Sequence, residues 1–478
     1  MGRPPEDRAI VPFPTYPVSN MEWVPKPITE RQLVAERLIA DACAEQAKRH
    51  GMTRGEFLRT AAATLTGFVV LNELYGSEAF AVTRKQCRDP EAARETLAKK
   101  YFVMDVQQHH VDLERYPEAL GCSLRFRDRG AAGGCPTVVG QTNFIKEVFV
   151  DSETDVGVIS GLPFGGIPLG PQAMLDTRDR VNGLAGGAER CLAQAVCDPA
   201  PQYQRDGVAT SIASLEGQVQ RGARALKCYT YSGNWRLDDE TIAYPMLAEV
   251  QRLGLRLVNV HKGLPAIFAP GSEETVRATD FPKVVRDWPE LNFCAYHSAW
   301  FGDGDHPEGK AGSSEFLELV SAMPKDQRKR VYAEIGSTFA IQIARGPDAA
   351  AHFIGQLLTV FGSRNILWGT DSIWWGSPQW LIDAFRCLQI PQSMQEQFGY
   401  PPLTEKAKRR ILGVNAARLY GVKPRPRPKG VIRGDQLAEA QDEQGGAHAG
   451  RRLVTYGPRT RREFLSMLRL ERRLERLA

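Results

Sequence analysis

Residues 256–262, Arg-Leu-Val-Asn-Val-His-Lys, and residues 292–298, Asn-Phe-Cys-Ala-Tyr-His-Ser, share the pattern that decides the predicted fold. Each stretch is a short apolar run that ends in a histidine, His261 in the first and His297 in the second. Near-continuous apolar runs of this length are typical of parallel strands that are buried on both faces. A polar residue directly after such a strand lies at the carboxyl end of a parallel sheet, where barrel folds carry their functional side chains.

The same pattern recurs along the middle of the chain, where β-rich runs alternate with amphipathic segments such as 239–253 and 348–361. The runs predict eight strands, over residues 102–106, 156–160, 191–196, 225–229, 256–260, 292–295, 331–334 and 366–368. Eight βα repeats predict an α/β fold of the (β/α)8 TIM-barrel class. A doubly wound open sheet is the structural alternative.

The chain is long enough for a barrel of about 250 residues with extensions at both ends, since it has 478 residues. We expect residues 1–99 to form a mixed N-terminal extension, Pro-rich at first and helical over 29–50, and residues 100–422 to form the barrel. Residues 423–478 begin with a Pro/Arg linker, and the polar stretch up to 450 is predicted to be poorly ordered. An amphipathic C-terminal helix over 461–477 is predicted to follow and to contact a partner subunit.

Composition excludes several classes of partner. The formal net charge of +5 is too small to indicate nucleic-acid binding, and no apolar run is long enough for stable membrane insertion. Nine cysteines without any CxxC pair argue against a disulfide framework and against a thiolate zinc site. We therefore expect a protein that acts on a small molecule, and the amphipathic C-terminal helix predicts a homodimer or a higher homo-oligomer.

Residues 52–81 contain a degenerate twin-arginine-like segment. Thr-Arg-Gly-Glu-Phe-Leu at 53–58 precedes an Ala-rich apolar run, and Ala79-Phe-Ala81 has the small residues of a cleavage site. However, Gly55 stands where the second arginine of such a signal belongs, and about fifty residues precede the motif. These departures favour a retained helix that packs on the barrel, and hence a cytoplasmic location, with export as the alternative.

Histidines are scarce in this chain, so their positions carry information. Only eight are present, and His109, His261 and His297 each follow a predicted strand. The eighth predicted strand leads into Asp371, which places a carboxylate at the same rim. A single histidine at a strand end is usually structural, but three of them with an aspartate on one rim predict a site for a metal ion.

Five short motifs occur in a specific order: Met104-Asp-Val-Gln-Gln-His-His110, Asn259-Val-His-Lys262, Ala295-Tyr-His297, Trp368-Gly-Thr-Asp-Ser372 and Ile411-Leu-Gly-Val-Asn-Ala-Ala-Arg-Leu-Tyr420. In this order and spacing the chain resembles the amidohydrolase-related family of metal-dependent TIM-barrel hydrolases and non-oxidative decarboxylases. The resemblance covers roughly residues 100–422.

The resemblance implies a single divalent metal, usually zinc, held by a first-strand pair together with His261 and Asp371. It also implies that His297 transfers protons beside the metal. The family writes the first-strand pair as His-x-His or Glu-x-His, whereas this chain has Gln107 and His109. Because an amide oxygen is a weaker donor, three outcomes follow as alternatives: weaker metal binding, preference for an oxygen-binding ion such as manganese, or a ligand set without Gln107. Strand alternation from Asp105 favours Gln107 and His109 as the inward pair, and a register slip to 108 and 110 is the alternative.

Other candidates lie beside the same rim. Glu334 ends the seventh predicted strand, and it is either a catalytic acid/base together with His297 and Asp371 or a hydrogen-bonded structural carboxylate. Substrate-binding candidates are the lysines at strand ends, for a substrate carboxylate, and aromatic residues after the sixth and eighth strands: Lys227, Lys262, Trp300 and Trp374. The glycine- and proline-rich stretch 162–170 is either a mobile lid or a turn-rich connection.

These residues lead to three functional hypotheses. Hydrolysis of an amide, ester or lactone-like bond of a small, aromatic or carboxylate-bearing substrate needs only a metal-activated water and a proton shuttle. Decarboxylation of an aromatic or unsaturated acid is the second hypothesis. The third is a non-catalytic barrel that has lost its metal through the glutamine at position 107.

Overall fold

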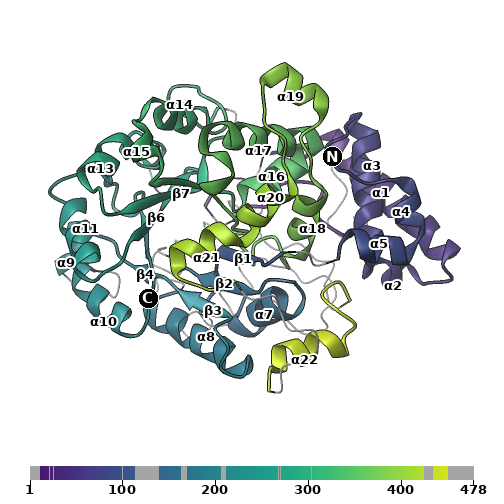
Figure 1. The fold of residues 1–478 in the computed structure, drawn as a ribbon, viewed down its shortest axis with the longest axis horizontal. Helices are drawn as coiled ribbons and strands as arrows, with labels where there is room; N and C mark the ends of the chain where they lie inside the picture. The colour runs from purple at the N-terminus through teal and green to yellow at the C-terminus, as the bar shows by residue number, and fades with distance from the viewer. Residues whose placement is uncertain are drawn as a thin grey trace.

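The computed structural model describes residues 11–20, 22–24, 26–98, 101–112, 139–162, 169–205, 211–266, 269, 271–302, 304–424 and 434–449. A barrel of parallel strands forms the centre, helices surround it, and the N-terminal helices lie together on one side (Figure 1). The predicted lid within 162–170 and the predicted C-terminal helix over 461–477 fall wholly or largely outside the described residues.

The strands lie close to where the apolar runs predict them. They are β1 (Met104–Gln108), β2 (Val156–Ile159), β3 (Cys191–Ala193), β4 (Ala195–Val196), β5 (Leu226–Tyr229), β6 (Leu257–Gly263), β7 (Asn292–Trp300), β8 (Val331–Glu334) and β9 (Ile366–Leu367). All neighbouring strands pair in parallel, in the orders β1-β2-β3 and β4-β5-β6-β7-β8-β9.

Two junctions join these sheets into a closed barrel. Only Gln194 separates β3 from β4, and its backbone N–H bonds to the carbonyl of Ile159, so the two segments form one strand position. At the second junction, between β1 and β9, the Val106 N–H donates to the carbonyl of Trp368 over 3.0 Å, and Gln108 forms a parallel β-bridge with Ser372. The (β/α)8 prediction is thus confirmed, and the open-sheet alternative is wrong.

Helices and short helical turns cover the outside of the barrel and build the extensions. Their bounds are α1 (Glu30–Arg49), α2 (Arg54–Leu58), α3 (Ala61–Tyr75), α4 (Arg84–Arg88), α5 (Pro90–Thr96), α7 (Gln141–Ile145), η3 (Lys146–Val150), α8 (Pro171–Leu184), α9 (Pro201–Arg205), η4 (Ile212–Ser214), α10 (Leu215–Gln220), α11 (Ala243–Arg252), α12 (Ser272–Thr275), α13 (Phe281–Asp287), α14 (Ser314–Ala322), α15 (Lys325–Arg328), α16 (Thr338–Arg345), α17 (Pro347–Phe361), η5 (Gly362–Arg364), α18 (Gln379–Cys387), α19 (Gln392–Phe398), α20 (Glu405–Arg409), η6 (Arg410–Val414), α21 (Asn415–Tyr420) and α22 (Gln436–Glu443).

The N-terminal helices pack on the barrel. Thr29 and Gln32 form a capping box that starts α1 close to the predicted position. Helix α3 contacts α1, α17 and α18, and the backbone around Ala79 to Ala81 bonds to the backbone of Cys387 and Gln389. Among the described residues, no helix is long and apolar enough to span a membrane.

Part of the stretch predicted to be poorly ordered is instead helical. Helix α22 begins after Asp435, which caps it by accepting the Ala438 N–H. Its Gln441 donates to the carbonyls of Val150 and Ser152, both at 2.8 Å, and Leu437 is buried. The prediction was wrong here because these docking contacts outweigh the polar composition of the segment.

The amino end of the barrel is filled by apolar side chains and closed by α21. Met104, Val106 and Val158 pack with Ala416 and Ala417 of that helix. The hydroxyl of Tyr420 accepts hydrogen bonds from Gln194 and Asn259 inside the barrel. Because this end is packed, a ligand reaches the interior only from the opposite, carboxyl end of the strands.

This closure depends on a glycine where η6 approaches the first strand. A Cβ at Gly413 would lie 2.7 Å from the ring of Phe102 and against its backbone carbonyl. We expect Gly413→Ala to lower the free energy of unfolding by about 2 kcal/mol, since the backbone carbonyl of Phe102 cannot move away without shifting the chain that leads into β1. Urea denaturation measures this loss.

Gly183→Ala is the matched control, because a Cβ at this position inside α8 would meet nothing within 4 Å. There we expect a gain of up to about 1 kcal/mol, from the better helix propensity of alanine. Equal effects of the two substitutions would contradict the tight approach of η6 to Phe102.

Candidate metal centre

Barrel register brings the rim residues together. His261 lies in β6 opposite Tyr229 of β5, and His297 lies in the neighbouring strand β7. The centroids of the two imidazole rings are 4.8 Å apart. His109 follows β1 and Asp371 follows β9, the two strands of the closing seam, so these two residues also meet.

Three residues of this cluster have an unusual backbone. His297, Asp371 and Ser337 are not glycines, yet their φ values are 61°, 59° and 52°. The bulge at His297 is held by the Thr338 hydroxyl, which donates to the His297 carbonyl over 3.0 Å. Left-handed residues of this kind cost free energy and concentrate at functional sites, so the strain independently marks this rim.

Each histidine is anchored through one ring nitrogen. His109 Nδ1 lies 2.8 Å from the Ser160 carbonyl, and His297 Nδ1 lies 2.8 Å from the Gly336 carbonyl. His261 uses Nε2, which lies 2.9 Å from the carbonyl of Gly263. Because a carbonyl only accepts, the anchored nitrogen carries a proton, and the other nitrogen faces the site.

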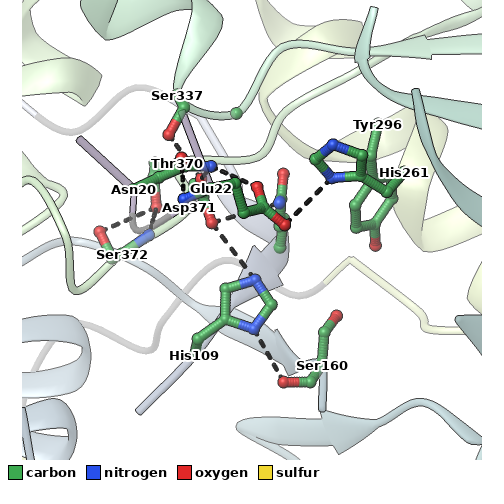
Figure 2. Close-up of polar contacts among 12 residues, drawn as sticks. Asn20, Glu22, His109, Ser160, His261, Tyr296, Ser337, Thr370, Asp371 and Ser372 are labelled. Carbon is green, nitrogen blue, oxygen red and sulfur yellow. Dashed lines mark hydrogen bonds and ion pairs between the residues drawn. The ribbon is translucent and has the colours of Figure 1, made fainter. Parts of the chain in front are cut away.

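The free nitrogens face carboxylates. His109 Nε2 lies 3.2 Å from Asp371 Oδ1, and His261 Nδ1 lies 3.2 Å from Glu22 Oε1. His297 Nε2 lies 3.7 Å from Glu22 Oε2. Figure 2 shows Glu22 between Asp371 and His261. A lone pair that faces a carboxylate oxygen is repelled unless a proton or a metal ion lies between them, so these residues fit a divalent cation.

Glu22 is a candidate site residue that the sequence did not reveal. Its carboxylate, with His261 and His297, forms a buried group whose possible ligand atoms all lie within 4.8 Å of one another. Tyr231 donates its hydroxyl proton to Glu22 Oε1 over 2.9 Å, and Asn20 donates to Oε2 over 2.6 Å. The weak signal in the sequence is an acidic residue inside the apolar run Met-Glu-Trp-Val at 21–24.

Both carboxylates are held in the ionised form. Burial alone would raise the pKa of Glu22, but His261, by charge and by hydrogen bonding, lowers it below the usual value. The pKa of Asp371 is also lowered, since contacts with His109 and His297 outweigh its burial. Asp371 further accepts hydrogen bonds from Asn20 and Ser337.

Gln107 points into the site, as strand alternation predicts. Its Nε2 lies 3.3 Å from His297 Nε2 and 3.2 Å from Asp371 Oδ1. Its buried Oε1 has no hydrogen-bond partner among the described residues. The alternative pair points elsewhere, because Gln108 lies against Gly157 and His110 bonds to Thr177 of α8.

Glu334 lies directly behind His297. Its carboxylate accepts the backbone N–H groups of His297, over 3.0 Å, and of Gly336. Burial raises the pKa of Glu334 to about 8, whereas burial lowers the pKa of His297 to about 4. The two hydrogen bonds that Glu334 accepts fix the backbone of His297.

Lys227 is a buried cation beneath the cluster. Its Nζ lies 3.7 Å from the ring centroid of Tyr296 and 4.4 Å from that of Tyr229. No hydrogen-bond acceptor contacts Nζ in the part of the chain that the structure describes. Burial lowers the pKa of Lys227 to about 8, and attraction to Glu22 opposes that shift. Lys227 thus places a positive charge beneath the carboxylates of Glu22 and Asp371.

Three predicted substrate-binding residues do not join the cluster. Lys262 is a correction, since its ammonium bonds to Asp280 over 2.6 Å and to the carbonyl of Thr275 over 2.9 Å, in a buried ion pair. Trp300 and Trp374 are buried in the hydrophobic core. The neighbouring Trp375 does reach the site, through a hydrogen bond from its indole N–H to the Ser337 hydroxyl.

Comparison with known proteins gives one family match. A family model described as amidohydrolase matches residues 179–422, about half of the chain, and begins after the first two strands. No curated protein matches the chain. Solved structures that resemble it include a probable 2-pyrone-4,6-dicarboxylic acid hydrolase from Acinetobacter baumannii, at 14% identity and a TM-score of 0.41, covering 67% of this chain and 99% of that one. Another is 5-carboxyvanillate decarboxylase from Sphingomonas paucimobilis, at 14% identity and a TM-score of 0.41, covering 68% and 100%.

Proposed function

The chain belongs to the amidohydrolase family of metal-dependent hydrolases and decarboxylases, and from this premise we propose that it hydrolyses an amide, ester or related bond of a small substrate. Family membership makes the chain an enzyme, and the matched residues include the motifs that end in His261, His297 and Asp371. The observation that carries the proposal is the set of three histidines, each anchored by a backbone carbonyl and each aimed at a carboxylate.

The proposed metal ligands are His109, His261 and Asp371, with Gln107 beside them. Imidazole nitrogens with a carboxylate oxygen suit zinc, and the amide of Gln107 makes manganese the second choice. When bound, such an ion activates water and polarises a carbonyl group.

His297 is the proposed proton-transfer residue. The bond from Nδ1–H to the Gly336 carbonyl fixes the tautomer, so that Nε2 is the atom that takes a proton from water and returns it to the leaving group. Asp371 is the proposed second catalytic group, and the Gln107 amide lies within hydrogen-bond distance of both its carboxylate and His297. We assign Glu334 a positioning role, since it accepts the backbone N–H of His297.

Decarboxylation of an aromatic or unsaturated acid is the second candidate, and Glu334 is the observation that favours it. A carboxyl group with a pKa of about 8 retains its proton near neutral pH, directly behind His297. Decarboxylation needs such a donor, because a proton replaces carbon dioxide on the substrate carbon. Lys227, buried below the rim, would offset part of the substrate's negative charge.

Metal analysis and a substrate panel test the proposal. We expect the purified protein to carry zinc or manganese, and dialysis against a chelator to abolish turnover until the metal is restored. Aryl esters, amides and lactones in the panel should release acid, whereas hydroxybenzoates that release carbon dioxide would select the second candidate. Protein that binds neither metal would support a non-catalytic barrel instead.

Location and assembly are further proposals. The burial of α3 against α1 and the barrel helices supports a retained helix, and therefore a cytoplasmic enzyme. The homodimer expected from the sequence is tested by light scattering of the full-length chain.

A further inference from the structure

We propose that Glu22 is a metal ligand delivered by the N-terminal strap, defined as residues 11–20 with 22–24, so that metal binding and docking of the strap depend on each other. The inference rests on the proposed metal centre and deepens it. It also explains how this chain supplies a second carboxylate although its first strand carries Gln107.

The strap enters the barrel mouth as a well-packed element. Phe13 stacks on Phe68 of α3 and on Trp380 of α18, with ring centroids 5.1 Å and 5.9 Å apart. Val18 and Ser19 are fully buried, and the Ser19 hydroxyl bonds to the Trp23 carbonyl over 2.7 Å. Apolar contacts thus bring the strap to the rim, and they hold the turn that carries Glu22.

Polar contacts then connect the strap to both halves of the metal centre. Asn20 donates to Asp371 Oδ2 over 2.9 Å and to Glu22 Oε2 over 2.6 Å. Glu22 in turn faces His261 and His297 and accepts the hydroxyl proton of Tyr231. Figure 2 shows this link, with Asn20 beside Asp371 and Glu22 extending toward His261.

Charge gives the reason for coupling. The Glu22 side chain is only 6% exposed, and Asp371 is only 2% exposed. Two carboxylates buried this close repel each other, although the buried ammonium of Lys227 attracts both. Without a bound cation, the strap therefore brings a second negative charge beside Asp371. With a divalent cation bound, the Glu22 carboxylate is attracted to the cation, and this attraction holds the strap in place.

Gln107 cannot take this role as it stands. Its amide donates toward Asp371, and it adds no negative charge to the rim. The end of its side chain lies 3.3 Å from His297 Nε2, so a carboxylate at position 107 would face the same group of ligands. This geometry provides a rescue variant in which the charge moves from the strap to β1.

The first test measures metal affinity of the full-length protein by competition with a chromophoric chelator, for zinc and for manganese. We expect Glu22→Gln to weaken binding at least about 100-fold, because the substitution keeps size and hydrogen bonding but removes the charge. Glu30→Gln is the control, an exposed glutamate at the start of α1, and should bind as the wild type does. Equal affinity of Glu22→Gln and wild type would overturn the inference.

The second test follows the strap itself by hydrogen–deuterium exchange. We expect added metal to slow exchange of residues 11–24 in the wild type but not in Glu22→Gln. The double variant Glu22→Gln with Gln107→Glu should regain metal affinity without regaining the metal-dependent protection of the strap. Two results would contradict the coupling. One is a wild-type strap that exchanges at the same rate with and without metal, and the other is a double variant that does not regain metal affinity.

These outcomes separate the inference from the function on which it rests. Wild-type protein that binds no metal removes the proposed metal centre altogether. Wild-type protein that binds metal equally with and without the Glu22 carboxylate keeps the centre but removes the strap from it. If Glu22→Gln instead binds metal normally and turns over faster, the strap obstructs the site, and the ligand role is wrong.

Discussion

Replacing His261 by alanine is expected to remove the metal and, with it, nearly all activity. His261 is fully buried, one ring nitrogen is held by the carbonyl of Gly263, and the other faces Glu22, so the ring is fixed toward the proposed metal position. We expect metal content to fall to background after dialysis and kcat/KM to fall by about 1,000-fold or more. Elemental analysis and steady-state kinetics measure the two effects.

His352→Ala is the control for this experiment. His352 lies on α17, away from the rim, and its ring bonds to the Tyr400 hydroxyl over 2.9 Å. Losing that contact should cost about 1 kcal/mol of stability and leave metal content unchanged. A His261→Ala protein that keeps its metal and most of its activity would place the reaction elsewhere.

Replacing His297 by glutamine is expected to separate chemistry from binding. If His297 transfers protons, kcat should fall by about 100- to 10,000-fold while KM and metal content change little. The group that takes the proton is then lost, but the ligands His109, His261 and Asp371 are kept. Stopped-flow or steady-state kinetics, with metal analysis of the same sample, checks this split.

Ser298→Ala is the companion variant, since Ser298 belongs to the same left-handed bulge and bonds through its hydroxyl to the Glu334 carbonyl. We expect it to lower kcat less than about ten-fold, because the imidazole of His297 remains. Loss of metal from the His297→Gln protein would assign His297 to the ligand set with Glu22 and His261, in place of proton transfer.

The strands were predictable because each is a short apolar run between helices and turns. The ends of the strands were less predictable. Strand β1 starts only at Met104, and β7 extends to Trp300, because beyond the bulge at His297 it pairs again with Gly263 of β6. Convergence of strand ends on one rim then brought His109, His261, His297 and Asp371 together from very different places in the sequence.

What the sequence did not reveal follows from the limits of periodic patterns. Glu22 lies in a segment without regular structure, and no periodicity connects that segment to the barrel rim. Lys262, by contrast, could have been recognised from the sequence as pointing away from the rim. Side chains alternate along a strand, so the strand that turns His261 inward turns Lys262 outward, toward Asp280. The helix over 436–443 depends on contacts with Val150 and Ser152, which local composition does not encode.

The seam between β1 and β9 sets the order in which this protein can be completed during synthesis. Gln107 and Asp371, which meet across that seam, are 264 residues apart in the chain. Helix α21, which closes the amino end of the barrel, is made later still. In a nascent chain, the edge of β1 that pairs with β9 therefore stays unpaired until nearly all of the barrel has left the ribosome. We expect slow folding, and a need for chaperones that shield this edge.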